Sequence, residues 1–294
     1  MIPIDVLTTY PCVTIAGAVI LGLLIGSFLN VVIYRLPLMM ERDWKNECRL
    51  LLEINDTATD KHNNETFNLA YPNSRCPSCN SAIRAWHNIP VVSYLLLKGR
   101  CSHCQIRISA RYPIIEAFTG FMSGVIAWQL GATPETLLAL ILTWSLISLT
   151  MIDADHQLLP DQITLPLLWS GLLINCFELF VPLHDAVWGA IAGYLSLWSV
   201  YWLFKLVTGK EGMGFGDFKL LAALGAWMGW QSLPVIILMS SLVGAVIGSI
   251  LLIINKQGRN TAIPFGPYLA IAGWITFLWG EPITQAYFRF TGIQ

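Results

Sequence analysis

Long uncharged runs of apolar residues, separated by short polar segments, occupy most of the chain. About 20 such residues in a helix are enough to cross the roughly 30 Å of hydrocarbon in a bilayer. We therefore predict about eight membrane-spanning helices, near residues 12–34, 113–130, 135–152, 162–180, 185–207, 217–230, 232–254 and 262–280. The uncharged run 220–255 contributes to two of them, because Gly229 and Pro234 predict a turn within it. The segment 217–230 is too short to cross the bilayer vertically.

One long polar block, about 36–112, separates the first two apolar runs. It contains the stretch "NDTATDKHNNET" (55–66), whose polar composition predicts a mobile surface loop. The wider polar stretch 42–70 suggests no role of its own.

Composition agrees with a polytopic membrane protein and excludes an ordinary soluble domain. Hydrophobic residues make up 55% of the chain and charged residues 12%, against about 25% charged in soluble domains. The first residues, "MIPIDVLTTYPC", lack the positive start of a cleavable signal, so the first run is predicted to be a permanent helix. When the polar block is placed in the cytoplasm, all Lys and Arg residues except Arg289 fall on the cytoplasmic side, as the positive-inside rule expects.

Four of the seven cysteines form two CxxC pairs, "CPSC" at Cys76–Cys79 and "CSHC" at Cys101–Cys104. Each pair presents two thiolates to one ion, and the four together complete a tetrahedral site typical of zinc. Four protein ligands leave no open position, so the predicted metal is structural rather than catalytic. The alternative is a set of free thiols, since an odd cysteine count with this spacing argues against a disulfide framework.

Two acidic residues lie at the ends of predicted spans. Asp153 ends the apolar run "TLLALILTWSLISLTMI", and Asp217 opens another. Carboxylates at membrane depth are costly and are functional candidates by default. If the two are neighbours they share one proton, so that the ionised member acts as general base toward a water and the protonated member as general acid. The alternative is that both are ordinary interfacial caps.

Two further aspartates compete for the same role. Asp161 follows Pro160 and precedes an apolar segment, which predicts an N-cap. Asp155 lies in a polar turn and is expected to be solvated.

Three alternating glycines, Gly212, Gly214 and Gly216, precede Asp217. They do not match the dinucleotide fingerprint and follow no predicted strand, so a nucleotide cradle is not indicated. Backbone without side chains can be approached closely, and an extended substrate could pair there by strand addition. The alternative is a flexible turn between helices.

Five motifs in order, covering nearly the whole chain, resemble those of the type IV prepilin peptidases, also called prepilin leader peptidase/N-methyltransferases. They are "GSFLNVVIYRLP" (Gly26–Pro37), the paired CxxC motifs, "IDADHQLLPD" (Ile152–Asp161), "GMGFGDFKLLAALGAWMG" (Gly212–Gly229), which contains the GxGD signature, and "IPFGPYLA" (Ile263–Ala270).

The resemblance implies an aspartic peptidase of the bacterial inner membrane whose active site faces the cytoplasm. Such an enzyme cuts the short, positively charged leader from type IV prepilins and type II secretion pseudopilins. It then methylates the new N-terminal amine with S-adenosylmethionine. The family's two catalytic aspartates map onto Asp153 and Asp217.

The expected fold is therefore an all-α polytopic membrane protein with a cytoplasmic zinc-binding domain inserted between its first two spans. The expected domains are a first transmembrane helix (1–35), the zinc-binding domain (36–112) and the transmembrane aspartic peptidase core (113–294). The N-terminal motif and the zinc-binding domain are the region expected to hold S-adenosylmethionine, although no residues are assigned to it. Expected partners are prepilin and pseudopilin substrates and the lipid bilayer, with no nucleic acid. No residue pattern indicates an oligomeric state.

Two other classes of protein agree with parts of the sequence. A polytopic transporter with a zinc-stapled cytoplasmic domain would use the aspartates for ion coupling, but no internal repeat with paired broken helices is visible. A membrane-anchored, nucleic-acid-binding zinc ribbon would explain the basic residues near the cysteines, but it leaves both aspartate motifs without a role.

Overall fold

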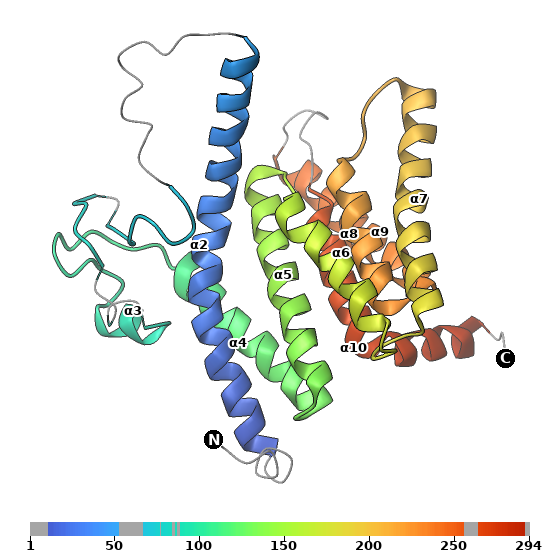
Figure 1. The fold of residues 1–294 in the computed structure, drawn as a ribbon, viewed down its shortest axis with the longest axis horizontal. Coiled ribbons are helices and arrows are strands. Elements are labelled where there is room, and N and C mark those ends of the chain that lie inside the picture. The colour runs from blue at the N-terminus through green and yellow to red at the C-terminus, as the bar shows by residue number, and fades with distance from the viewer. Residues whose placement is uncertain are drawn as a thin grey trace. The chain divides into compact units, whose positions relative to one another are not determined.

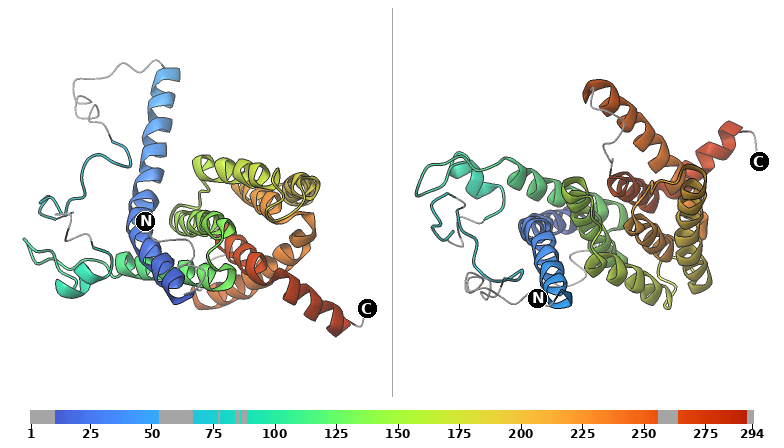
Figure 2. Two further views of the ribbon diagram at one scale, coloured as in Figure 1. Left: turned by 60° about the horizontal axis from the view of Figure 1, so that its bottom comes forward. Right: turned by 90° about the horizontal axis from the view of Figure 1, so that it is seen from above.

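The computed structural model describes residues 11–52, 67–76, 78–83, 86, 89–255 and 264–291. Over these residues the chain is helical, and its strand-like pairing is limited to two isolated bridges, Arg75–Ala82 and Arg100–Arg107. A helix occurs at each of the eight predicted places (Figures 1 and 2), so the predicted all-helical class is confirmed. The predicted loop 55–66 lies outside the described residues. The chain divides into two compact units, Met1–Ala132 and Thr133–Gln294.

The first unit is built on two helices that pack side by side, α2 (Pro11–Leu51) and α4 (Arg111–Leu130), with the short helix α3 (Val92–Leu96) between them in sequence. The predicted first span, near 12–34, lies within α2, which continues beyond the apolar run to Leu51. The residues after the apolar run are mostly good helix formers. A 2.6 Å hydrogen bond from Lys45 to Glu41 adds an i,i+4 pair on the exposed side. The length of an apolar run indicates which part of a helix is suited to lipid. It does not indicate where the helix ends.

A buried arginine connects α2 to the segment that leads into the first cysteine pair. The guanidinium of Arg35 donates hydrogen bonds to the carbonyl oxygens of Asn68 (2.9 Å) and Pro72 (2.6 Å). Arginine carries five N–H donors in a fixed fork and can therefore hold several carbonyls at once. This gives a structural role to one residue of the "GSFLNVVIYRLP" motif.

The second unit contains six helices of 14 residues or more within the described residues. They are α5 (Pro134–His156), α6 (Asp161–Asn175), α7 (Leu183–Thr208), α8 (Phe215–Met228), α9 (Leu233–Asn255) and α10 (Gly266–Thr291), with the short 3-10 helix η3 (Trp230–Ser232) before α9.

Helix α8 forms the centre of this unit. It packs against α6, α7, α9 and α10, and its residues from Leu220 to Trp227 are all buried. A helix that is apolar on every side is stable only when other elements surround it, and α8 carries no charge after Lys219. Its 14 residues give a length of about 21 Å, so it is shorter than the hydrocarbon layer, as the sequence predicts.

Four helical segments in the described part of the chain are long and apolar enough to cross a membrane: Pro11–Leu51, Pro134–His156, Leu183–Thr208 and Trp230–Ile250. They identify a polytopic membrane protein. The remaining long helices are shorter or carry more polar residues, as α4 does with Arg111 and Glu116.

Candidate active site and metal centre

Asp153 lies in the last turn of α5, where the helix is about to end. The helix stops because Gln157 takes a left-handed conformation (φ 53°), from which its N–H donates to the carbonyl oxygen of Asp153 at 2.9 Å. The Asp153 residue is only 5% exposed. A carboxylate this buried needs a hydrogen-bond donor or a proton.

Asp217 lies in the first turn of α8, three residues after the N-cap Gly214. It is 6% exposed, and its Oδ1 atom is buried without a hydrogen-bond partner. Asp153 lies close enough for its charge to act on Asp217. The two aspartates of the sequence hypothesis therefore lie in one unit and interact, although they are 64 residues apart in the chain.

Leu159, in the turn between α5 and α6, packs against the start of α8. A Cβ atom on Gly216 would lie 2.7 Å from the Cβ of Leu159, closer than two such atoms can approach. Gly216 therefore allows the α5–α6 turn to lie directly against the first turn of α8. Because Gly216 is helical, the three alternating glycines do not form one extended segment, and a substrate strand cannot pair along all of them.

Gly266, the first residue of α10, was not singled out by the sequence analysis as a site residue. Its backbone N–H donates to Oδ2 of Asp153 at 3.0 Å. The sequence signals are the motif "IPFGPYLA" (Ile263–Ala270), which contains Gly266, and the following Pro267, since proline favours the first turn of a helix. The contact joins residues 113 positions apart, which no local pattern reveals.

The two competing aspartates have other surroundings. Asp161 is the first residue of α6, Pro160 is the N-cap, and no side-chain cap is formed, so the N-cap prediction for Asp161 is wrong. Instead both carboxylate oxygens of Asp161 accept hydrogen bonds from Nζ of Lys219, each at 2.7 Å. Tertiary packing places a lysine of α8 within reach, and a charged partner is a stronger donor than a backbone N–H. Asp155 is exposed, as the sequence predicts.

In the first unit, the four cysteines of the CxxC pairs form a single cluster. One sulfur atom from each of Cys76, Cys79, Cys101 and Cys104 lies within 4.8 Å of the others, and the Cys76 and Cys104 sulfurs are 3.7 Å apart. A tetrahedral zinc with Zn–S bonds of about 2.3 Å has sulfurs about 3.8 Å apart. The cluster thus has the donor set and spacing of a site that could hold a metal ion.

The two cysteine turns are built alike, 25 residues apart. Cys76 N–H donates to Ser81 and Asn80 N–H donates back to Cys76, while Cys101 pairs with Ile106 and Gln105 in the same way. Asn80 (φ 54°) and Gln105 (φ 59°) take left-handed conformations at equivalent places. Two equivalent turns that each present a pair of thiols to one point are the expected framework of a four-cysteine metal site.

The surroundings of two of these thiols favour the thiolates that a metal needs, whereas, despite a backbone hydrogen bond from Ile106, burial and the neighbouring cysteines raise the pKa of Cys104 to about 11. A hydrogen bond with the Ser81 hydroxyl, 3.0 Å from the sulfur, lowers the pKa of Cys79 to about 6. Backbone hydrogen bonds from Cys104 and His103 lower the pKa of Cys101. A thiolate is the metal-binding form of cysteine.

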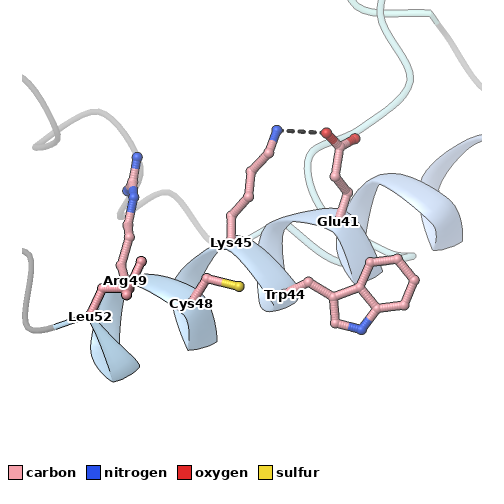
Figure 3. A pocket seen from close by; sticks show the side chains of 6 residues that line it. All are labelled: Glu41, Trp44, Lys45, Cys48, Arg49 and Leu52. Atoms are coloured by element: carbon pink, nitrogen blue, oxygen red, sulfur yellow. Dashed lines mark hydrogen bonds and ion pairs between the residues drawn. The ribbon is translucent and has the colours of Figure 1, made fainter.

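A surface groove of about 370 Å³ runs along the C-terminal end of α2 (Figure 3). Its lining residues come from α2 and the residue after it: Glu41, Trp44, Lys45, Cys48, Arg49 and Leu52. Among the described residues its lining comes from this one stretch of the chain, whereas a site for a cofactor of the size of S-adenosylmethionine encloses most of its ligand.

Comparison with known proteins covers both units. Residues 20–130 match the bacterial peptidase A24 N-terminal domain, and residues 140–249 match the type IV leader peptidase family. Proteins named prepilin leader peptidase/N-methyltransferase are 57% identical in Stutzerimonas stutzeri and 56% identical in Pseudomonas aeruginosa, each with 99% of both chains covered. The protein of that name in Neisseria gonorrhoeae is 54% identical, with 92% of both chains covered. No solved structure matches the chain.

Proposed function

This chain belongs to the prepilin leader peptidase/N-methyltransferase family, and we propose that it is a bifunctional membrane enzyme of the same activity. It removes the leader peptide of type IV prepilins and type II secretion pseudopilins, and it methylates the newly exposed N-terminal amine. The observation that carries the peptidase activity is the pair of buried carboxylates, Asp153 at the end of α5 and Asp217 at the start of α8, which interact through their charges.

The two aspartates hydrolyse the peptide bond together. Two buried carboxylates whose charges interact hold one proton between them. The ionised member removes a proton from a water as the water attacks the scissile carbonyl carbon, and the protonated member donates to the carbonyl oxygen. When the C–N bond breaks, a proton passes to the leaving amine and the pair returns to its starting state.

The four cysteines hold a structural zinc ion. Cys76, Cys79, Cys101 and Cys104 supply four sulfur ligands, which match the number and spacing that tetrahedral zinc requires. With all four positions filled by protein, the ion when bound supplies a cross-link between the two cysteine turns. The methyl donor is S-adenosylmethionine, whose binding residues are not assigned.

We place the enzyme in the bacterial inner membrane with its active site toward the cytoplasm. The proposed division is a first transmembrane helix (1–35), a cytoplasmic zinc-binding domain (36–112) and a transmembrane peptidase core (113–294), with about eight spans in total. The distribution of Lys and Arg supports this orientation. A substrate whose basic leader stays in the cytoplasm and whose apolar segment lies in the bilayer would present its cleavage site at that boundary.

A cleavage assay in membranes with a model prepilin tests the peptidase activity. We expect Asp153→Asn and Asp217→Asn each to abolish cleavage while the protein remains folded. Asp155→Asn is the matched control, because Asp155 lies two residues from Asp153 but is exposed, and it should cleave at the wild-type rate. Retained cleavage in either of the first two variants would refute the two-aspartate mechanism.

A further inference from the structure

The two aspartates have unequal surroundings, and the difference arises at the start of α10. Oδ2 of Asp153 accepts the Gly266 N–H at 3.0 Å. The first N–H groups of a helix have no partner within the helix, and they lie at the positive end of its dipole. A carboxylate held there is stabilised in its charged form.

Asp217 also lies at a helix start and has a backbone hydrogen bond from Gly214 to its carboxylate, but its Oδ1 atom is buried and unpaired. A buried carboxylate oxygen without a donor is costly when the group is charged. A protonated Asp217 instead carries an O–H that can donate to a neighbouring oxygen. The negative charge of the pair is therefore favoured on Asp153 and the proton on Asp217.

Position 266 also fits no side chain. A Cβ atom there would lie 2.6 Å from Oδ2 of Asp153 and 3.2 Å from Cδ2 of Leu159. Leu159 is itself confined on its other side by Gly216. Any substitution at position 266 therefore pushes the Asp153 carboxylate away from the amide that it binds.

From these contacts we propose that Gly266 is a positioning residue that fixes the roles of the two aspartates. Its backbone N–H holds Asp153 as the general base, which takes the proton from the attacking water. Asp217 is then the general acid, which gives its proton to the scissile carbonyl oxygen. The inference rests on the proposed peptidase function, because it assigns roles within the same pair.

The sharpest test removes the N–H and adds no atoms. Gly266→glycolic acid replaces one backbone amide by an ester in the full-length enzyme, made by incorporating the hydroxy acid during translation. The matched control is Gly229→glycolic acid, which removes one backbone hydrogen bond (2.8 Å, to Gly225) at the opposite end of α8. Rates of prepilin cleavage are measured from pH 4 to 10 in detergent micelles, with thermal unfolding of each variant as the folding check.

We expect the Gly266 ester to shift the acidic limb of the pH–rate profile upward by about one to two pH units, the range given by a hydrogen bond to a charged group. The limb moves upward because Asp153, without its hydrogen-bond donor, takes up a proton at a higher pH. Once protonated, it can no longer act as the general base. The alkaline limb should stay in place, and the Gly229 ester should move neither limb.

Gly266→Ala, which keeps the N–H but displaces the carboxylate, should lower kcat at least tenfold, whereas Gly280→Ala in the same helix should not. An unmoved acidic limb in the Gly266 ester, an equal shift in the Gly229 ester, or a shift of the alkaline limb alone would overturn the role of Gly266. Those results would leave the two-aspartate mechanism intact if both Asp→Asn variants are inactive. Cleavage by an Asp→Asn variant would overturn the mechanism itself.

Discussion

The ion pair between Asp161 and Lys219 joins the start of α6 to the first turn of α8, two residues after Asp217. Nζ of Lys219 lies 2.7 Å from both carboxylate oxygens of Asp161. We predict that the pair positions Asp217 and takes no part in the chemistry. Removing either charge should therefore slow cleavage moderately, and exchanging the two charges should restore most of the lost rate.

The expected magnitude follows from the geometry and from solvent access. The short contacts to both oxygens favour the strong end of the range, but the Asp161 side chain is 50% exposed and the Lys219 side chain 28% exposed. Water then screens the interaction, and exposed pairs contribute about 0.2–1 kcal/mol rather than the several kcal/mol lost when a buried pair is broken. A loss of about 1 kcal/mol in the transition state corresponds to a rate lower by roughly fivefold.

The assay is a charge-exchange test on kcat/KM for a model prepilin, with the melting temperature of each variant in the same detergent. Asp161→Asn and Lys219→Gln should each lose about fivefold or less. The exchange Asp161→Lys with Lys219→Asp should recover at least half of that loss on a logarithmic scale. The reasoning fails if the exchanged protein is slower than both single variants. It also fails if Asp161→Asn is as inactive as Asp153→Asn, since Asp161 would then belong to the catalytic group.

Three further perturbations test other parts of the molecule. Cys76→Ser should lower the zinc content of the purified protein measured by mass spectrometry, Cys48→Ser should not, and equal zinc in both would contradict the four-cysteine site. Asn175→Ala should lower the melting temperature by several degrees. The buried Asn175 side chain donates to the Ala226 carbonyl (2.9 Å) and accepts from the Phe180 and Val181 amides, and each of these groups left unpaired costs about 1–3 kcal/mol. An unchanged melting temperature would refute this prediction. Gly216→Ala should destabilise by about 1–3 kcal/mol through overpacking against the Leu159 Cβ. The same change should cost less in a Leu159→Gly background, which removes that Cβ, so an equal cost in both backgrounds would contradict the contact.

Local patterns predicted the helices and made the two aspartates candidates for physical reasons. A helix needs an apolar stretch to be buried in lipid or in protein, so the runs themselves mark α5, α7 and α9. Charge at the end of such a run is costly, which makes Asp153 and Asp217 conspicuous in the sequence. The cysteine cluster is equally local, because each CxxC turn determines its own geometry.

Contacts between distant segments were beyond local reasoning. The Gly266 amide reaches Asp153 across 113 residues, and Lys219 reaches Asp161 across 58. Asp161 therefore looked like an N-cap, because the proline and the apolar run around it satisfy that pattern without any knowledge of α8. The sequence likewise did not show how far the first helix extends beyond its apolar run, since hydropathy reports burial in lipid while backbone propensity continues α2 to Leu51.

The measurement that tests the two-aspartate account most directly is the cleavage rate of Asp153→Asn, Asp217→Asn and the double variant in one assay. Residues that act as a unit lose their effect together, so each single change should cost as much as both. We predict three equally low rates, with each protein still folded by thermal unfolding. Losses that add on a logarithmic scale, or one single variant that keeps measurable cleavage, would show that the two carboxylates do not act as a pair.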